Sequence, residues 1–169
     1  MKHPLAAPRI VIDTNTVLDM LVFEDPAAHD LLAQLHRGAL EWLAAPPMRE
    51  ELARVLNYPQ IAKRLQTRTL SPADVLAAFD ALVVMKPVAA RAAFVCKDRD
   101  DQQFIDLALA WQAALLSKDR AVLSMARRMA RLGVAVSSSW SALQAQLIVS
   151  SGSDASGVGT LGDVNGVCS

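Results

Sequence analysis

Short apolar runs alternate along this chain with segments whose apolar residues recur at helical spacing. The first run, residues 9–13, is β-branched and ends in a carboxylate, which is typical of a strand buried on both faces of a parallel sheet. Three later runs, at residues 40–44, 114–117 and 134–136, have a similar character. Strands that are separated by helices favour an α/β fold with a parallel sheet.

Helix start and stop signals fill the intervals between these runs. Proline at the first helical position follows two candidate N-caps, Asp25 and Ser71. Asp100 is a third candidate N-cap, and Gln103 three residues later would complete a capping box with it. The sequence predicts helices over residues 14–22, 26–37, 46–56, 72–85, 100–112, 121–132 and 139–148.

The composition bounds the class of protein. With 169 residues, 53% of them hydrophobic and 20% charged, the chain can bury one compact core and is neither a disordered nor a coiled-coil protein. Its 17 basic residues balance 17 acidic ones, which excludes attachment to nucleic acid by bulk charge alone. We expect one domain over residues 1–149 and a disordered tail over residues 150–169, which are Gly/Ser-rich and almost uncharged.

Cysteine, histidine and hydropathy patterns exclude further classes. Cys96 and Cys168 lie far apart, and the three histidines show no ligand spacing with them, so neither a disulfide framework nor a Cys-rich zinc module is expected. No apolar run approaches the ~18 residues of a membrane span, and the first residues lack the apolar stretch of a signal peptide. We therefore expect a soluble, cytoplasmic protein with no membrane partner.

Two carboxylates follow predicted strands. Asp13 ends the first strand, and Asp119 lies just beyond the strand at 114–117. In open α/β sheets the binding crevice lies beyond the carboxyl ends of the strands, so both side chains are expected there. Taken alone, Asp13 is equally well explained as an Asx turn or a helix cap.

Helical phase selects two more carboxylates. At ~100° per residue, Glu51 lies at the flank of an apolar helix stripe, whereas Glu50 points into solvent. Taken alone, Glu51 is better explained as a side chain that extends outward. Asp101 lies one turn before Phe104 and Ile105, in the middle of an inward stripe, where a merely solvated carboxylate would be poorly placed. An inward Asp101 beside two strand-end carboxylates suggests a shared anionic pocket.

Convergence of these four carboxylates in one crevice has a chemical consequence. They would repel one another and raise each other's pKa values, so the cluster is costly unless a cation neutralises it. Ligand sets made only of oxygen select Mg²⁺ or Mn²⁺ over zinc. Ions held in this way orient phosphate oxygens and activate water for in-line attack. The residues therefore indicate a metal-dependent phosphoryl-transfer or nuclease site.

Four short motifs follow one another along the chain. They are Ile-Val-Ile-Asp-Thr-Asn at 10–15, Glu-Leu at 51–52 with Val-Leu at 55–56, Asp-Arg-Asp-Asp at 98–101 with Phe104 and Ala108, and Leu-Ser-Lys-Asp at 116–119. In this order and spacing they resemble the PIN-domain family, in the branch labelled as toxin components of toxin–antitoxin systems. The resemblance covers about residues 9–143. It implies a three-layer α/β/α sandwich with a central parallel sheet, and a Mg²⁺- or Mn²⁺-dependent ribonuclease.

The resemblance also implies roles for individual residues. The family's metal-binding and catalytic acids fall on Asp13, Glu51, Asp101 and Asp119. Its supporting polar positions fall on Asn15, which would hold the metal water or Asp13, on the small hydroxyl residue Ser117, and on the further acids Asp98 and Asp100. Whether Asp100 or Asp101 is the direct ligand stays open in the motif, and the helical phase favours Asp101.

The chain departs from this branch at a few positions. Arg99 stands where proline is common, Gln102 where a third consecutive Asp is common, and Trp111 and Gln112 where glycines are common. None of these departures removes a core acid, so activity remains expected, whereas the local shape of the rim of the site is left open.

Basic residues flank the predicted acidic site and would track the phosphates of an RNA backbone. The candidates are Arg49, Arg54, Lys118, Arg120, Arg127 and Arg128. An ordinary solvated helix face explains the same pattern equally well. Aromatic residues are only 5% of the chain, so no base-stacking platform is evident.

Two other functions remain as alternatives to the ribonuclease. A phosphatase of the haloacid-dehalogenase type also places Asp after its first strand, but it needs a second Asp two positions on, where Asn15 stands. The chain could instead be a catalytically weak PIN-fold protein that binds partners or RNA. In toxin–antitoxin pairs of this family the antitoxin covers the acidic groove and the toxin dimerises, so the resemblance implies a cognate antitoxin and a homodimer.

Overall fold

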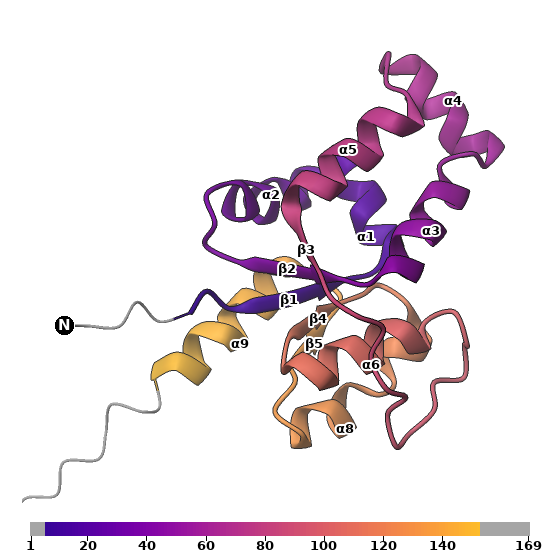
Figure 1. The fold of residues 1–169 in the computed structure, drawn as a ribbon. Helices are drawn as coiled ribbons and strands as arrows, with labels where there is room; N and C mark the ends of the chain where they lie inside the picture. Colours follow the sequence, from indigo (N-terminus) through magenta and orange to yellow (C-terminus); the bar gives the residue numbers. More distant parts are fainter. Residues whose placement is uncertain (1–5, 153–169) are drawn as a thin grey trace, which may run out of the picture.

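The computed structural model describes residues 6–152 and has a five-stranded, all-parallel sheet at its centre (Figure 1). The strands are β1 (Arg9–Ile12), β2 (Glu41–Ala44), β3 (Val83–Met85), β4 (Ala114–Leu116) and β5 (Val136–Ser137). Their order is β3-β2-β1-β4-β5. The chain moves outward from β1 to β3 and then returns across the sheet to β4, so the order of strands reverses between β1 and β4.

Helices cover both faces of this sheet. They are α1 (Thr14–Leu18), α2 (His29–His36), α3 (Pro46–Val55), α4 (Pro59–Thr67), α5 (Pro72–Leu82), α6 (Gln102–Trp111), α7 (Arg120–Leu123), α8 (Ala126–Arg131) and α9 (Trp140–Gly152), with a π-helical turn η1 (Asp19–Phe23) and a 3₁₀ turn η2 (Pro26–Ala28). The helices α1, α2, α3 and α5 lie on one side of the sheet, and α6 and α8 lie on the other (Figure 1). The indole N–H of Trp140 donates to Asp30 of α2 (2.7 Å), which holds α9 against α2. The predicted three-layer α/β/α sandwich is confirmed.

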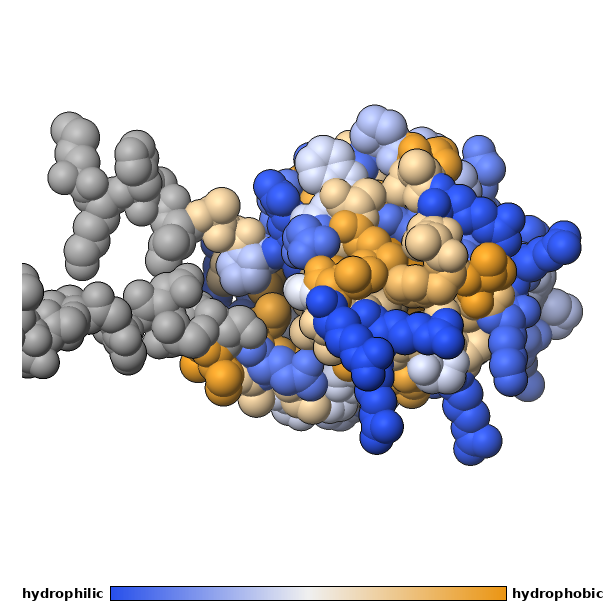
Figure 2. All heavy atoms as spheres, turned by 90° about the horizontal axis from the view of Figure 1, so that it is seen from below, coloured by the Kyte–Doolittle hydropathy of each residue, from blue (hydrophilic) through white to orange (hydrophobic). Residues whose placement is uncertain are grey.

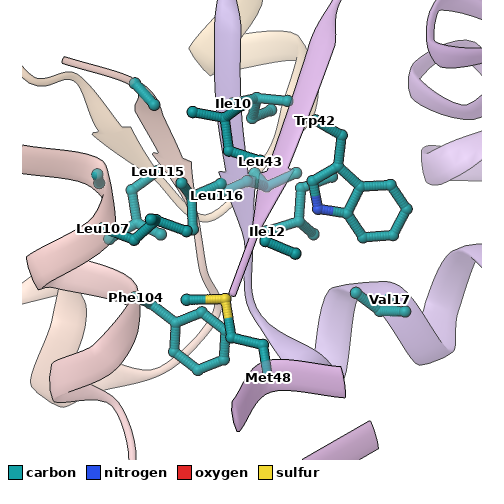
Figure 3. Close-up of a cluster of buried hydrophobic side chains, with 14 of the residues drawn as sticks. Ile10, Ile12, Val17, Trp42, Leu43, Met48, Phe104, Leu107, Leu115 and Leu116 are labelled. Atoms are coloured by element: carbon teal, nitrogen blue, oxygen red, sulfur yellow. The ribbon is translucent and has the colours of Figure 1, made fainter. Parts of the chain in front are cut away.

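The core lies where β1 and β4 meet the helices of both layers. Ile10 and Leu115 on these strands are fully buried, which explains why both runs are continuously apolar instead of alternating. Figure 3 shows Phe104 of α6 and Met48 of α3 converging on this centre. A buried side chain of this size contributes roughly 1.5–3 kcal/mol. This rigid centre fixes the positions at which β1 and β4 end.

Two elements differ from the sequence-based predictions on the β3 side of the sheet. The start and stop signals predict no element over residues 57–70, which contain α4; Ile61 and Leu65 bury one face of that helix. The predicted helix over 72–85 is too long, because it ends at Leu82 and residues 83–85 form β3 beside β2. Here the β-branched pair Val83-Val84 extends the sheet by one edge strand.

The segment after β4 also differs. The predicted single helix over residues 121–132 is broken into α7 and α8. At the break the Ser124 hydroxyl donates to the carbonyl of Ala121 (2.6 Å), and the Met125 N–H donates to the carbonyl of Val122 (2.9 Å). These i→i−3 bonds tighten the last turn of α7 and end it.

The last helix runs past its predicted end at residue 148. The helix α9 continues to Gly152, so the predicted start of the tail at residue 150 falls inside it. The rest of the predicted tail, residues 153–169, lies outside the described residues. Within the described part of the chain, no helix combines the length and apolarity needed to cross a membrane.

Candidate metal and catalytic site

Asp13 lies directly beyond the carboxyl end of β1 and is only 3% exposed. The backbone N–H of Thr16 donates to its Oδ1 (2.8 Å), so Asp13 does cap α1 as the ordinary explanation requires. Ser117 Oγ and the backbone N–H of Lys118 donate to Oδ2 (2.7 and 3.1 Å). These three donors replace the water that the carboxylate loses on burial. Its position is therefore fixed from both β1 and β4.

Ser117 joins the ends of β1 and β4 and is fully buried. Its hydroxyl donates to Asp13 Oδ2 and accepts from the backbone N–H of Asp119 (3.1 Å). One side chain thus sets the position of two of the four predicted acids. A hydroxyl is suited to this place because it donates and accepts at the same time.

Asp101 and Asp119 form a close pair of carboxyl groups. Asp119 caps α7 by accepting from the N–H of Ala121 (2.6 Å), and Asp101 begins α6. Asp101 Oδ2 is buried and accepts no hydrogen bond from the described residues. Burial first, then the negative charges of Asp119, Asp98 and Asp13 together with a hydrogen bond to Asp119, raise the pKa of Asp101 to about 7. Asp13, Asp101 and Asp119 therefore meet at the carboxyl end of β1 and β4.

Glu51 extends from α3 and is partly buried, whereas Glu50 beside it is exposed, as the helical phase predicts. The amide of Gln103 donates to Glu51 Oε2 (2.6 Å). Burial raises the pKa of Glu51, and hydrogen bonds from Thr14 and Gln103 oppose this rise, as does the charge of Arg54. The hydrogen-bond partners of Glu51 differ from those of the other three acids, so it is positioned separately from them.

Of the supporting residues that the resemblance implies, Asn15 and Ser117 differ in their contact with Asp13. Asn15 is exposed on α1, and the donors to Asp13 are Thr16, Ser117 and Lys118. The implied support of Asp13 by Asn15 is therefore absent among the contacts of the described residues. Ser117, the other residue that the resemblance assigns to support, does donate a hydrogen bond to Asp13.

The predicted capping box at the start of α6 is wrong. The helix begins after Asp101, and the backbone N–H of Asp100 pairs with Asp98 Oδ1 (2.9 Å). The Gln103 amide nitrogen donates to Glu51 and to the carbonyl of Asp100, and its Oε1 accepts from no backbone N–H of the described residues. Asp98 and Asp100 are both exposed, and Asp98 contributes to the site through its charge on Asp101.

The donor set suits a hard divalent cation. Asp101 contacts Asp119 and lies within the field of Asp13, one buried oxygen of Asp101 lacks a donor, and burial together with the neighbouring negative charges raises the pKa of Asp101. A cation with oxygen ligands relieves all three features. Within residues 6–152, however, no group of three or more His, Cys, Asp or Glu side chains already has the arrangement of a metal site. The ligand assignment stays a prediction.

The basic residues that the sequence selected fall into two groups. Arg49 makes a two-pronged ion pair with Asp80 (2.7 Å for both contacts), and Lys118 Nζ pairs with Asp19 (2.6 Å). The others are exposed and form no ion pair with a described residue: Arg54, Arg120, Arg127 and Arg128. Figure 2, seen from the side of α6 and α8, shows long hydrophilic side chains around a hydrophobic area.

Sequence reasoning missed the neighbours that hold Glu51 and the acidic loop. Thr14 and Gln103 bond to Glu51 from other elements, and Gln102 binds the loop before α6. Gln103 was recognisable only as a capping residue, and Gln102 only as a departure from a motif. No local pattern reports a hydrogen bond that crosses from α6 to α3.

The fold and the site together define the class of this protein. It is an α/β protein with a parallel sheet, and its carboxyl groups lie beyond the ends of the central strands β1 and β4. The chain matches the family model described as PIN domain over residues 9–121, which is more than half of its length. It therefore belongs to the PIN-domain family, whose members are in general nucleases that use divalent metal ions.

A solved structure shares this fold. It is the crystal structure of VapBC2 from Rickettsia felis bound to a DNA fragment from their promoter, with a TM-score of 0.53 and 11% identity. The match covers 76% of this chain and 97% of that chain. No curated protein matches the sequence.

Proposed function

We propose that this chain is a Mg²⁺- or Mn²⁺-dependent ribonuclease that hydrolyses RNA phosphodiester bonds. Its metal-binding and catalytic acids are Asp13, Glu51, Asp101 and Asp119. The observation that carries the proposal is the buried, unpaired Oδ2 of Asp101, whose carboxyl group lies against Asp119 and within the field of Asp13. Such a group is stable only where a proton or a cation neutralises it. Membership of the PIN family supports the nuclease class.

The chain's own residues orient this site. Ser117 and two backbone N–H groups fix Asp13, and the N–H of Ala121 fixes Asp119. With a pKa of about 7, Asp101 can hold a proton near neutral pH, and it would release that proton on holding a cation. When bound, the metal ion supplies positive charge that polarises the phosphodiester. Glu51 is held at the rim by Thr14 and Gln103.

Substitution of the acids tests the activity. We expect Asp13→Asn and Glu51→Gln to lower Mn²⁺-dependent cleavage of a single-stranded RNA by at least about 100-fold. Glu50→Gln is the matched control, because Glu50 is on the same helix as Glu51 and is exposed. It should cleave at the wild-type rate. Wild-type cleavage by Asp13→Asn would refute the proposal.

The biological role that we propose is the toxin of a toxin–antitoxin pair, acting on RNA in the cytoplasm and inhibited by a cognate antitoxin protein. The likeness to VapBC2 supports this role through its fold. Expression in a bacterial host should arrest growth for the wild type and not for Asp13→Asn. Co-expression with the product of a small open reading frame beside the gene should restore growth. Growth unaffected by the wild type would contradict the role.

We also propose a homodimer, which light scattering on the eluting protein would test directly. A mass of one chain at micromolar concentration would contradict it. The dimer does not depend on the activity, so it can fail without affecting the ribonuclease proposal.

A second candidate function is a PIN-fold module that binds partners or RNA without cleavage. One observation favours it: in the described residues no three-ligand metal group is preformed. Calorimetry with Mn²⁺ separates the two functions. Heat of binding that Asp13→Asn abolishes supports the enzyme, and no heat with the wild type supports the module.

A further inference from the structure

A cavity opens beside Gln103, the hydrogen-bond partner of Glu51, between the end of β2, the loop before α6 and α6 itself. Its volume is about 420 Å³, which is within the range of small-ligand pockets. Ala45, Pro47 and Val88 give it an apolar wall, while Arg91, Arg99 and Gln103 give it polar groups. The cavity therefore combines apolar surface with two cationic side chains.

Both arginines of this cavity are available to a ligand. Arg91 and Arg99 are exposed, and neither forms an ion pair with a described carboxylate. Asp106 also lines the cavity, but its Oδ1 already accepts from the N–H of Ala92 and from the amide of Gln102 (2.8 and 2.7 Å). The lining thus carries two positive charges against one negative charge that is already hydrogen-bonded. This balance favours an anionic ligand.

Gln103 connects this cavity to the acidic site. Its amide nitrogen donates to Glu51 Oε2, and its Oε1 is buried and accepts no hydrogen bond from the described residues. An unpaired buried acceptor costs about 1–3 kcal/mol unless a donor reaches it. Gln103 therefore joins the lining of the cavity to Glu51, while its own unpaired oxygen is enclosed by the protein.

The wall that carries the arginines is held in place from α6. The amide of Gln102 donates to the carbonyl of Phe94 (3.3 Å), and its Oε1 accepts from the N–H of Cys96 (2.6 Å). Together with the Ala92 to Asp106 bond, these contacts pin the loop between Arg91 and Arg99 against the helix. These hydrogen bonds therefore hold the loop in position as one wall of the cavity.

We propose that this cavity binds a nucleotide of single-stranded RNA next to the nucleotide at the acidic site. Arg91 and Arg99 bind its phosphate, and the apolar wall receives its sugar and base. The inference rests on the proposed ribonuclease function, because it places the cavity along the same substrate. It adds two arginines that were outside the basic set selected from sequence.

Binding without cleavage tests the proposal. The protein is titrated into a labelled single-stranded RNA in EDTA, so that metal-dependent hydrolysis does not interfere. The double variant Arg91→Ala/Arg99→Ala should raise Kd at least roughly tenfold. Because the two arginines contact one phosphate, their loss should also lower the slope of log K against log salt by about 0.7, since a single strand gives ~0.7 per phosphate.

Two matched variants sharpen this test. Lys63→Ala/Arg64→Ala removes the same charge from exposed positions on α4, and it should change Kd less than about twofold. Arg91→Lys/Arg99→Lys keeps the charge and should retain the salt slope while losing part of the affinity, because lysine lacks the fork of arginine. Unchanged melting temperatures verify that all variants are folded.

The outcomes separate this inference from the proposed function. An unchanged Kd and slope for Arg91→Ala/Arg99→Ala, an equal loss in the α4 control, or no RNA binding by the wild type would each overturn it. RNA binding that depends on the two arginines, without any Mn²⁺-dependent cleavage, contradicts the ribonuclease and leaves the cavity assignment standing. Where cleavage occurs, the arginine variant should raise KM for RNA and leave kcat within about twofold.

Discussion

At the scale of single residues, the position of the site depends on one buried hydroxyl. Ser117 bonds to Asp13 and to the backbone of Asp119, so it ties together two acids from neighbouring strands. A carboxylate as deeply buried as Asp13 is stable only while its donors remain. The serine therefore acts as a positioning residue for the proposed chemistry.

Removal of this hydroxyl gives the first residue-scale prediction. Ser117→Ala leaves Asp13 Oδ2 with one donor fewer and should lower the free energy of unfolding by about 1–3 kcal/mol. Ser124→Ala removes a hydroxyl that is exposed at the end of α7, and it should change stability by less than about 0.5 kcal/mol. Urea unfolding of both variants measures the difference. Equal effects would mean that the buried bond to Asp13 is worth no more than an exposed one.

The second residue-scale prediction concerns pH. The pKa of Asp101 is raised from 3.8 to about 7, so between these values the folded state holds a proton that the unfolded state has released. Stability in EDTA should therefore fall as pH rises from about 4 to 7. Asp101→Asn should reduce this slope and, after allowance for solvent screening, raise Tm at pH 8 by roughly 2–4 °C.

Thermal melts across this pH range check the expectation for Asp101. Glu50→Gln is the control, because it removes an exposed carboxylate from a different helix and should keep the wild-type slope. A wild type whose Tm is constant from pH 5 to 8 in EDTA would contradict the raised pKa.

Sequence patterns reached the acids of the site and, through the family resemblance, the supporting Ser117, but not the partners of Glu51. Asp13 and Asp119 follow from strand ends, and Asp101 from the phase of α6, since these signals are local. The bonds of Glu51 to Thr14 and Gln103 join three different elements, and their existence depends on how the helices pack. The metal-ligand roles themselves remain predictions.

At the scale of elements, the strands at the centre of the sheet were easier to predict than its edge. β1 and β4 are apolar because both of their faces are buried, so their composition alone identifies them. β3 is a three-residue edge strand with two exposed residues, and it follows α5 without a turn. Its strand conformation comes from pairing with β2, a tertiary contact that overrides a continuous helical pattern.

The loop before α6 carries the element-scale prediction. Gln102 is 6% exposed and makes three hydrogen bonds, to Phe94, Cys96 and Asp106. Gln102→Ala should free this loop, so that the backbone amide of Cys96 exchanges with solvent at least roughly tenfold faster. Gln66→Ala, at an exposed position on α4, should leave that exchange rate unchanged. An unchanged Cys96 amide in Gln102→Ala would show that the loop is held by other contacts.

At the scale of the whole molecule, the reversal of strand order gathers chemistry from distant parts of the chain. Asp13 and Ser117 are more than a hundred residues apart in sequence, yet they share a 2.7 Å hydrogen bond. Gln103, which lines the cavity together with Arg91 and Arg99, donates a hydrogen bond to Glu51. The two arginines of the cavity and the acids of the site are thus held by different parts of the fold, although the net charge of the chain is zero. Under the proposed function, a cation would bind among the acids while phosphates bind at the arginines.

Metal binding should consequently stabilise the entire fold. A cation that binds only the folded state adds about 2.7 kcal/mol at a concentration of 100 times its Kd, which corresponds to a rise in Tm of roughly 5–10 °C for a domain of this size. The rise should be smaller at pH 5.5 than at pH 8, because protons compete for Asp101 below its pKa of about 7. EDTA should reverse it fully.

The control variants for this metal effect follow from the site. Asp13→Asn should lose most of the Mn²⁺-induced rise in Tm, because one carboxylate of the cluster is neutral. Glu50→Gln should keep it, because that side chain points into solvent. Scanning calorimetry with and without Mn²⁺ measures all three proteins. If Asp13→Asn were stabilised as much as the wild type, the cation would be binding elsewhere, and the three acids beyond β1 and β4 would not be the metal ligands.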